Sequence, residues 1–156
     1  MAFVNSIRSV VKFRKLEINR TKRLLRKAAN VEDLRKLAKR RLPIGVFDYI
    51  DGGAEDEITL RKNVEAYRKV SFKPRVLRDM ANIDTSTSLF GRKLAFPLVL
   101  APTGFTRIAH SEGELAVVRA ATRAGIPFTL STMATRSIEE CASVAEKDSR
   151  LWFQIY

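Results

Sequence analysis

Two apolar runs, each followed by a segment with helix signals, limit most strongly what this chain can fold into. Residues 97–101 and 127–131 are apolar almost throughout, and residues 151–156 begin a third run of the same kind. A continuous apolar run is typical of a strand that is covered on both faces, as in a parallel sheet. We therefore predict three neighbouring parallel strands.

The segments between these runs carry the signals of helix ends. Ser111 to Glu114 fits a capping box, and the helix that it predicts ends at Gly125. Ser137 to Glu140 fits a second capping box ahead of the third run. Strands that alternate with helices form right-handed crossovers, so we expect an α/β fold with a parallel sheet.

The turn after the first run separates two α/β architectures, the open dinucleotide-binding sheet and the closed (β/α)8 TIM barrel. Residues 101–105 contain one glycine where a G-x-G-x-x-G loop needs three, which favours the barrel. A full barrel takes about 250 residues. The chain supplies two βα units and a third strand, so we interpret it as a fragment truncated after the third strand, with residues 97–156 as the incomplete barrel.

Residues 30–96 form a predicted region of helices and a β cap ahead of the barrel. One helix begins at Asn30 and ends at Leu42-Pro43, and a second leads to Gly52-Gly53, for which we expect positive φ angles. The acidic run 55–57 then opens a third helix, in which residues 60, 64 and 67 form the inner face.

A strand-like segment follows these helices. Residues 70–74 alternate between apolar and polar side chains, and the segments 85–90 and 93–96 flank Gly91. This pattern predicts a small antiparallel cap.

The net charge of +12 is concentrated at the amino end. Residues 1–41 hold 14 Lys and Arg against 3 acids, while the remaining residues hold 15 against 14. Phe3, Ile7 and Val10 recur at helical spacing among these charges. We expect residues 1–29 to form a basic arm that attaches to an anionic membrane surface or an acidic partner; an organelle transit peptide and a solvated helix are the alternatives.

Several classes are excluded or disfavoured by composition. There is no zinc-finger spacing and no basic stripe interleaved with aromatic residues, so we expect no nucleic-acid partner. The longest apolar stretch, residues 96–102, is too short to span a bilayer. The single Cys141 excludes an internal disulfide and a multi-cysteine metal site, and it is expected to be a packing residue in a cytoplasmic protein.

Short motifs along residues 31–156 together resemble one family. The chain is similar in order and spacing to the FMN-dependent 2-hydroxy-acid dehydrogenases and oxidases, and among them to bacterial quinone-linked L-lactate dehydrogenases. The motifs are residues 47–57 with Thr59, Leu60 and Asn63, then 74–77, 84–87, 101–104, His110 with Gly113 and Glu114, 130–132 and 153–156.

The resemblance implies a flavin site at the carboxyl ends of the strands. It places the backbone of Pro102, Thr103 and Gly104 against FMN, and Ser131 and Gln154 at the polar edge of its ring. Without the resemblance, the first three residues would be a strand-end turn, Ser131 a capping or turn residue, and Gln154 a half-exposed strand residue.

The resemblance also implies that Tyr49 and Tyr156 bind the carboxylate and the 2-hydroxyl group of the substrate. Buried aromatic packing is the alternative for each tyrosine. Met133 stands near the substrate, where relatives often carry a larger aromatic residue. His110, the single histidine, matches a structural histidine, so the catalytic base and a carboxylate-binding arginine are expected beyond Tyr156.

The implied reaction is oxidation of an L-2-hydroxy acid by FMN, with L-lactate to pyruvate as the expected case. The chain alone is expected to be inactive. A quinone acceptor, peripheral contact with the inner face of the cell membrane and a homo-oligomer of the full-length protein are further expectations, and no metal site is expected. The alternative is a non-catalytic remnant or a binding module that acts through the basic arm.

Overall fold

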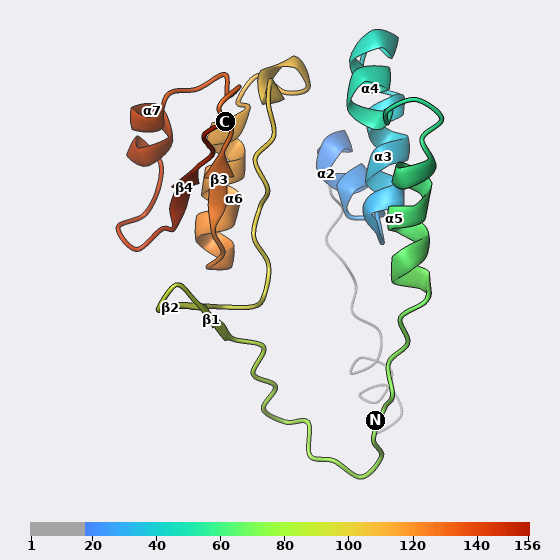
Figure 1. Cartoon of the computed structure of the whole chain (residues 1–156), viewed down its shortest axis with the longest axis vertical. Coiled ribbons are helices and arrows are strands. Elements are labelled where there is room, and N and C mark those ends of the chain that lie inside the picture. The colour runs from blue at the N-terminus through green and yellow to red at the C-terminus, as the bar shows by residue number, and fades with distance from the viewer. Residues whose placement is uncertain (1–17) are drawn as a thin grey trace, which may run out of the picture. The chain divides into compact units, whose positions relative to one another are not determined.

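The computed structural model describes residues 18–156 and divides the chain into two units, with the boundary between Asp51 and Gly52. Figure 1 shows the helices of the first unit in blue and cyan and the strands of the second in colours from yellow-green through orange to dark red. The predicted helical spacing of Phe3, Ile7 and Val10 lies outside the described residues.

The first unit consists of three short helices: α2 (Arg20–Leu25), α3 (Val31–Lys39) and α4 (Ile44–Asp51). The predicted cap of α3 is confirmed, because the Asn30 side chain accepts a hydrogen bond of 2.9 Å from Asp33 N. Helix α4 follows Pro43, as expected, and Phe47 is its buried residue. The apolar residues of α3 stay exposed to different degrees, with Val31 80% exposed.

The prediction for Gly52-Gly53 is wrong, since neither glycine has a positive φ angle. The left-handed positions are Glu55 and Glu57, with φ of 50° and 56°. Helix α5 (Ile58–Arg68) begins after Glu57, so the acidic run precedes the helix and none of its members lies in the first turn. The Glu57 carboxylate instead accepts a hydrogen bond of 3.1 Å from Gly53 N, which closes the turn.

The inner face predicted for α5 is not covered by the described residues of its unit. Leu60, Val64 and Tyr67 are 40%, 56% and 84% exposed. The strand predicted for residues 70–74 is also wrong: residues 70–86 form no strand, and Phe72 is 99% exposed. Pro74 has no N–H group, and no described segment pairs with this stretch, so alternation alone does not make a strand here.

The predicted antiparallel cap is confirmed as a shorter hairpin of β1 (Thr87–Leu89) and β2 (Arg92–Leu94), in which Ser88 faces Lys93. Phe90 and Gly91 both have positive φ, 50° and 72°, as a tight two-residue hairpin turn requires. Ala95 N donates to Gly125 O at 3.3 Å, just ahead of the next strand. The hairpin therefore joins the second unit at the amino ends of its strands.

The predicted parallel strand pairing is confirmed, but the sheet has two strands where three were predicted. Strands β3 (Phe128–Leu130) and β4 (Leu151–Phe153) pair in parallel, with Thr129 facing Trp152. Residues 97–101 form only one parallel bridge, from Leu100 to Phe128, in place of a full strand. Pro97 and Pro102 bracket this run, and a proline cannot donate to the ladder.

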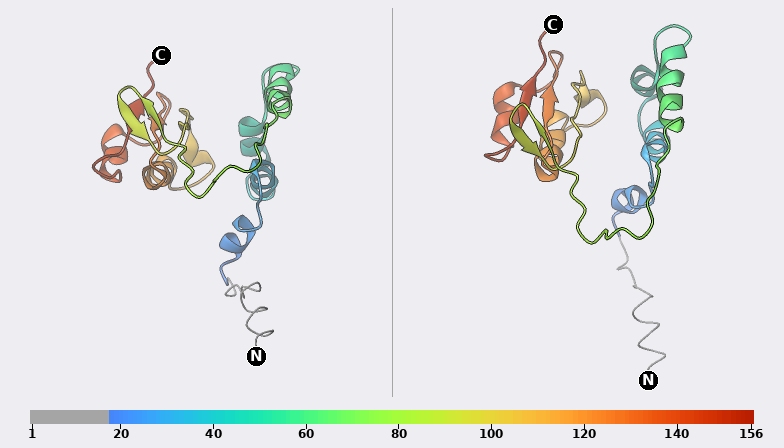
Figure 2. Two further views of the ribbon diagram at one scale, coloured as in Figure 1. Left: turned by 90° about the horizontal axis from the view of Figure 1, so that it is seen from below. Right: turned by 60° about the horizontal axis from the view of Figure 1, so that its bottom comes forward.

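Among residues 18–156 the strands form two two-stranded sheets, so this part of the chain contains no closed barrel. Helix α6 (Glu114–Ala124) packs against β3, and α7 (Ile138–Ser143) packs against α6; Figures 1 and 2 show this layer beside the strands. The core consists of Val118, Ala121, Ile126, Phe128, Leu130 and Cys141, and partly buried apolar residues pack against it.

The two predicted capping boxes have opposite outcomes. Ser137 and Glu140 form the box as predicted, with Ser137 N donating to Glu140 at 2.9 Å and Glu140 N donating to Ser137 Oγ at 3.1 Å. The box at Ser111 is wrong, because Gly113, with φ of 51°, precedes α6 and no side chain caps it. The predicted helix end at Gly125 is confirmed.

Gly125 and Gly45 offer a matched pair of substitutions with opposite expected effects. Gly125 has φ of +66°, and a Cβ there would lie 3.2 Å from Ala95 Cβ, so Gly125→Ala should lower the free energy of unfolding by about 1 kcal/mol. Gly45 has open space around it, and Gly45→Ala should raise this free energy by about 0.5 kcal/mol. Urea denaturation of both variants tests the expectation; equal effects would contradict it.

Candidate functional site

The carboxyl ends of the parallel segments meet at one edge of the second unit. The turn after Leu100, the residue after β3 and the residue after β4 all lie at this edge, because the three segments run in the same direction. Gln154 N donates to Leu130 O at 2.9 Å, so the pairing extends one step past β4. Polar side chains from two segments meet here.

Ser131 and Gln154 are joined by a hydrogen bond. Ser131, which is 5% exposed, donates from Oγ to Gln154 Oε1 at 3.1 Å and accepts from Met133 N at 3.1 Å. The Gln154 Oε1 also accepts from Thr132 N at 3.3 Å, and Thr132 Oγ1 donates to Gln154 O at 2.6 Å. The network fixes the side chain of Gln154 at the edge of the sheet.

The direction of the Gln154 amide follows from these partners. A backbone N–H can only donate, so the atom that faces Thr132 N has to be the amide oxygen. Nε2 is then turned away from Thr132 N, and it makes no hydrogen bond with any of the described residues. The amide therefore keeps two N–H donors that can bind a ligand with hydrogen-bond acceptors.

The turn of Pro102, Thr103 and Gly104 lies close to this network. A Cβ on Gly104 would be 3.1 Å from Met133 Cβ and 3.9 Å from Ser131 Oγ, so the turn is packed against the residues after β3. Phe105 N donates to Met133 O at 3.0 Å and holds the two segments together. Gly104 is thus adjacent to Ser131, which binds Gln154, and the neighbouring Thr103 is exposed.

Glu114 supports the same edge through a contact that the sequence patterns did not predict. It is 1% exposed, and its carboxylate accepts hydrogen bonds of 2.8 Å from both Thr135 N and Thr135 Oγ1. Burial acts to raise its pKa, and the hydrogen bonds from Thr135 and from the start of α6 outweigh burial, so the pKa lies below its ordinary value. Glu114 therefore ties α6 to the turn after β3.

The two predicted substrate tyrosines lie in different units. Tyr49 belongs to α4 and is 63% exposed, and Tyr156 follows β4 and is 78% exposed. Neither is buried, so the alternative of buried aromatic packing does not describe them in this structure. The second unit brings Gly104, Ser131 and Gln154 together. Tyr49 belongs to the first unit and Tyr156 to the second.

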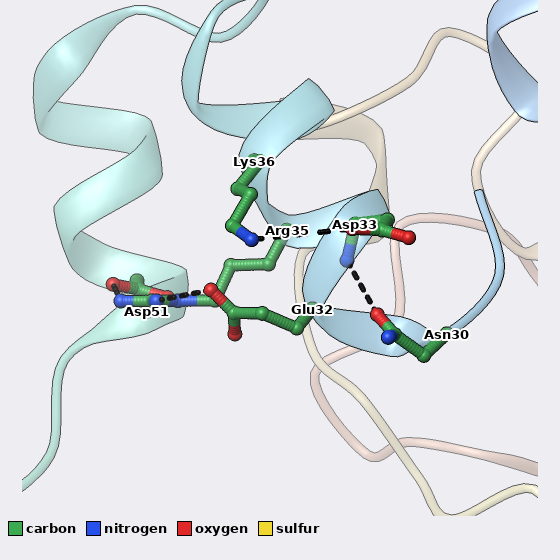
Figure 3. Close-up of polar contacts among 6 residues, drawn as sticks. All are labelled: Asn30, Glu32, Asp33, Arg35, Lys36 and Asp51. Atoms are coloured by element: carbon green, nitrogen blue, oxygen red, sulfur yellow. Dashed lines mark hydrogen bonds and ion pairs between the residues drawn. The ribbon is translucent and has the colours of Figure 1, made fainter. Parts of the chain in front are cut away.

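Helix α4 is held against α3 by a bidentate ion pair, which Figure 3 shows. Arg35 donates from Nε to Asp51 Oδ1 and from Nη2 to Oδ2, the latter at 2.7 Å, and from Nη1 to Glu32 at 3.2 Å. The hydrogen bond from Arg35 is the main cause that lowers the pKa of Asp51; burial opposes it, and the charges of Arg35 and Lys39 add to it.

Replacing Arg35 with methionine is expected to raise the pKa of Asp51 toward its ordinary value, since the main hydrogen-bond donor is lost. The titration of the Asp51 carboxyl carbon by NMR measures this change. Lys36→Met is the control, because Lys36 pairs with Asp33 and not with Asp51. An Asp51 titration that stays the same in the Arg35 variant would show that the pair does not form in solution.

His110 and Cys141, two residues of chemically reactive types, have structural roles here. His110 Nδ1 accepts from Glu112 N at 3.3 Å, and Gly113 N donates to His110 O at 2.9 Å, so the histidine shapes the turn ahead of α6. Cys141 is 2% exposed within the core, and burial raises the pKa of its thiol. Within residues 18–156, no group of three or more His, Cys, Asp or Glu side chains is placed to hold a metal ion.

A family model described as FMN-dependent dehydrogenase matches residues 38–156. The chain is 42% identical over 153 residues to a putative L-lactate dehydrogenase of Mycobacterium tuberculosis, covering 98% of this chain and 37% of that protein. It is 48% identical over 125 residues to an L-lactate dehydrogenase of Alcaligenes faecalis, covering 80% and 32%.

Solved structures match in fold as well. A soluble mutant of the membrane-associated (S)-mandelate dehydrogenase from Pseudomonas putida aligns with a TM-score of 0.76 at 45% identity, covering 81% of this chain and 36% of that one. The chain spans about a third of the length of these relatives.

Proposed function

The chain belongs to the FMN-dependent dehydrogenase family, and from this premise we propose that it supplies the first units of a (β/α)8 barrel enzyme that oxidises an L-2-hydroxy acid. L-Lactate, oxidised to pyruvate, is the proposed substrate, since L-lactate dehydrogenases stand among the relatives. The single observation that carries the proposal is the edge at which Gly104, Ser131 and Gln154 meet.

The residues of this edge fit the cofactor that the family uses. The two free donors of Gln154 Nε2 would bind acceptors of the flavin ring, and Ser131 holds the amide in that orientation. The turn of Pro102, Thr103 and Gly104 would lie along the ring, since it has no side chain at position 104. A bound FMN supplies a two-electron acceptor.

The substrate would be bound by Tyr49 and Tyr156. The two residues are 63% and 78% exposed, so neither is enclosed by packing that would keep a carboxylate or a 2-hydroxyl group away. His110 shapes a turn and is not proposed as the base. The base that takes the substrate proton, and an arginine that binds the carboxylate, are proposed to come from outside residues 1–156.

Three finer proposals concern partners. A quinone is proposed as the electron acceptor, the full-length protein as a homo-oligomer, and residues 1–29 as an arm that contacts an anionic membrane surface from the cytoplasm. The support for the arm is its charge, and a relative in this family is membrane-associated. No helix built from residues 18–156 is long and apolar enough to cross a bilayer.

A chimera tests the proposal, with the rest of the barrel supplied by a relative. In it, this chain replaces the corresponding third of the Alcaligenes faecalis L-lactate dehydrogenase, to which it is 48% identical. A folded chimera that binds FMN and oxidises L-lactate is the expected result. A chimera that is folded by circular dichroism yet binds no FMN would overturn the proposal.

A further inference from the structure

A basic groove lies in the first unit, between α2 and the end of α3. Its volume is about 410 Å³. Three leucines, which we call the floor, and three arginines, which we call the rim, line it together with one threonine; these residues are Arg20, Thr21, Leu24, Leu25, Leu37, Arg40 and Arg41. It is separate from the edge that carries Ser131 and Gln154, which belongs to the second unit.

Among the residues that the structure describes, no carboxylate neutralises the rim charges. Within residues 18–156, no ion pair joins Arg20, Arg40 or Arg41 to a carboxylate. The two acids of α3, Glu32 and Asp33, lie in its first turn and pair with Arg35 and Lys36. The groove therefore presents three guanidinium groups at the end of α3 that lies away from these acids.

Helix stability alone does not explain this arrangement. Cations at the carboxyl end of a helix are favoured by the helix dipole, which accounts for Arg40 and Arg41 after α3. Arg20 is the first residue of α2, where the dipole opposes a cation. A positive charge at this unfavourable end, lining the same groove as two other arginines and two exposed leucines, points to an anionic ligand.

The leucines of the floor and the arginines of the rim together favour a ligand that is both apolar and anionic. Leu24 and Leu25 are 37% and 51% exposed, so the groove offers apolar surface to a hydrocarbon chain. Guanidinium groups bind phosphate oxygens through paired N–H donors. An acidic peptide would satisfy the rim and would not need the floor. We propose that this groove binds the headgroup and upper acyl chain of an anionic phospholipid at a membrane surface.

The inference rests on the proposed membrane contact and places it in the groove instead of in residues 1–17. The test measures binding of the full chain to vesicles of neutral phosphatidylcholine and to vesicles that also contain phosphatidylglycerol. We expect binding only to the anionic vesicles, and weaker binding as salt is raised.

Three variants separate the groove from general charge. Arg20→Gln/Arg40→Gln/Arg41→Gln should weaken binding on the order of 100-fold, at about fivefold per charge near an anionic surface. The control Lys62→Gln/Lys69→Gln/Lys73→Gln removes the same charge elsewhere and should change binding less than tenfold. Leu24→Gln should weaken binding while leaving its salt dependence unchanged, because it removes apolar contact alone.

The other outcomes are distinguishable. If the groove variant and the lysine control lose vesicle binding equally, the groove is not a specific site. The attachment would then be generally electrostatic. Loss only in Phe3→Gln/Ile7→Gln/Val10→Gln would assign the contact to residues 1–17 and also overturn the groove. If inorganic phosphate at constant ionic strength releases the protein from the vesicles, the groove binds free phosphate. The proposal of a lipid ligand would then be wrong. If the chain binds no vesicle, the proposed membrane contact is wrong. The flavin proposal is tested separately by the chimera.

Discussion

Replacing Glu114 with alanine is expected to lower the free energy of unfolding by about 3 kcal/mol, because two hydrogen bonds to a charged group contribute about 1.5 kcal/mol each. The carboxylate is 1% exposed, and both of its bonds of 2.8 Å go to Thr135. Without it, the N–H group of Thr135 loses its partner at the turn after β3. Urea denaturation of the two proteins measures the difference.

The matched control is Glu112→Ala, two residues earlier. Glu112 is exposed and pairs with Arg119 at the surface, so its loss should matter far less than that of Glu114. Thr135→Val combined with Glu114→Ala should cost less than the sum of the two single changes, since both remove the same contact. Additive losses would contradict the contact.

The same carboxylate predicts a pH dependence. The folded-state pKa of Glu114 lies below its ordinary value of about 4.3. Its contribution is therefore present above that pH, and it is lost as the pH falls through the folded-state pKa. Glu114→Gln should flatten the fall of stability below about pH 4 relative to the unchanged chain. An identical acid profile in the two proteins would show that this carboxylate does not titrate with a shifted pKa.

Replacing Gln154 with glutamate in the chimera is expected to weaken FMN binding by about 30-fold, which corresponds to about 2 kcal/mol for two lost hydrogen bonds. Glutamate keeps an oxygen for Ser131 Oγ and Thr132 N and replaces only the two donors of Nε2. The change therefore tests the free amide group separately from the network that holds it. Flavin fluorescence during titration with FMN measures the affinity.

Thr132→Val is the control for this variant. It removes the hydroxyl that donates to Gln154 O and leaves Nε2 in place, so the FMN affinity should change less than threefold, or by about 0.6 kcal/mol. If both variants lose FMN equally, the network as a whole supports the site and Nε2 has no separate role. If neither loses it, Gln154 does not bind the flavin.

Local rules predicted the elements whose signals lie within a few residues. The caps at Asn30 and Ser137, the turn at Gly91 and the helix end at Gly125 depend on side chains or φ angles next to the element itself. The order of strands and helices also follows from the apolar pattern. The α/β class was therefore predictable from the chain alone.

The errors arise where partners distant in sequence decide the outcome. Glu114 was predicted to complete a box with Ser111, and instead it binds Thr135, 21 residues away. Residues 97–101 pair only through the single bridge from Leu100 to Phe128, a residue in the next strand. The strand at residues 70–74 has no described partner. A pattern within one segment carries no information about these contacts.

In the candidate site too, some features follow from the local sequence and others depend on contacts between segments. Position at the carboxyl ends of the strands was predictable for Pro102, Thr103, Gly104, Ser131 and Gln154 from the parallel order. The orientation of the Gln154 amide was not, because it is set by Thr132 N and Ser131 Oγ in three dimensions. The roles of Tyr49 and Tyr156 stay predictions that depend on the family resemblance.

The absorbance spectrum of the purified chimera before and after addition of L-lactate tests the central claim most directly. We expect a yellow protein whose flavin band is bleached by L-lactate under anaerobic conditions, because we propose that the edge formed by Gly104, Ser131 and Gln154 is part of a flavin site. A folded, colourless chimera, or a yellow one that L-lactate does not bleach, would contradict the proposed function.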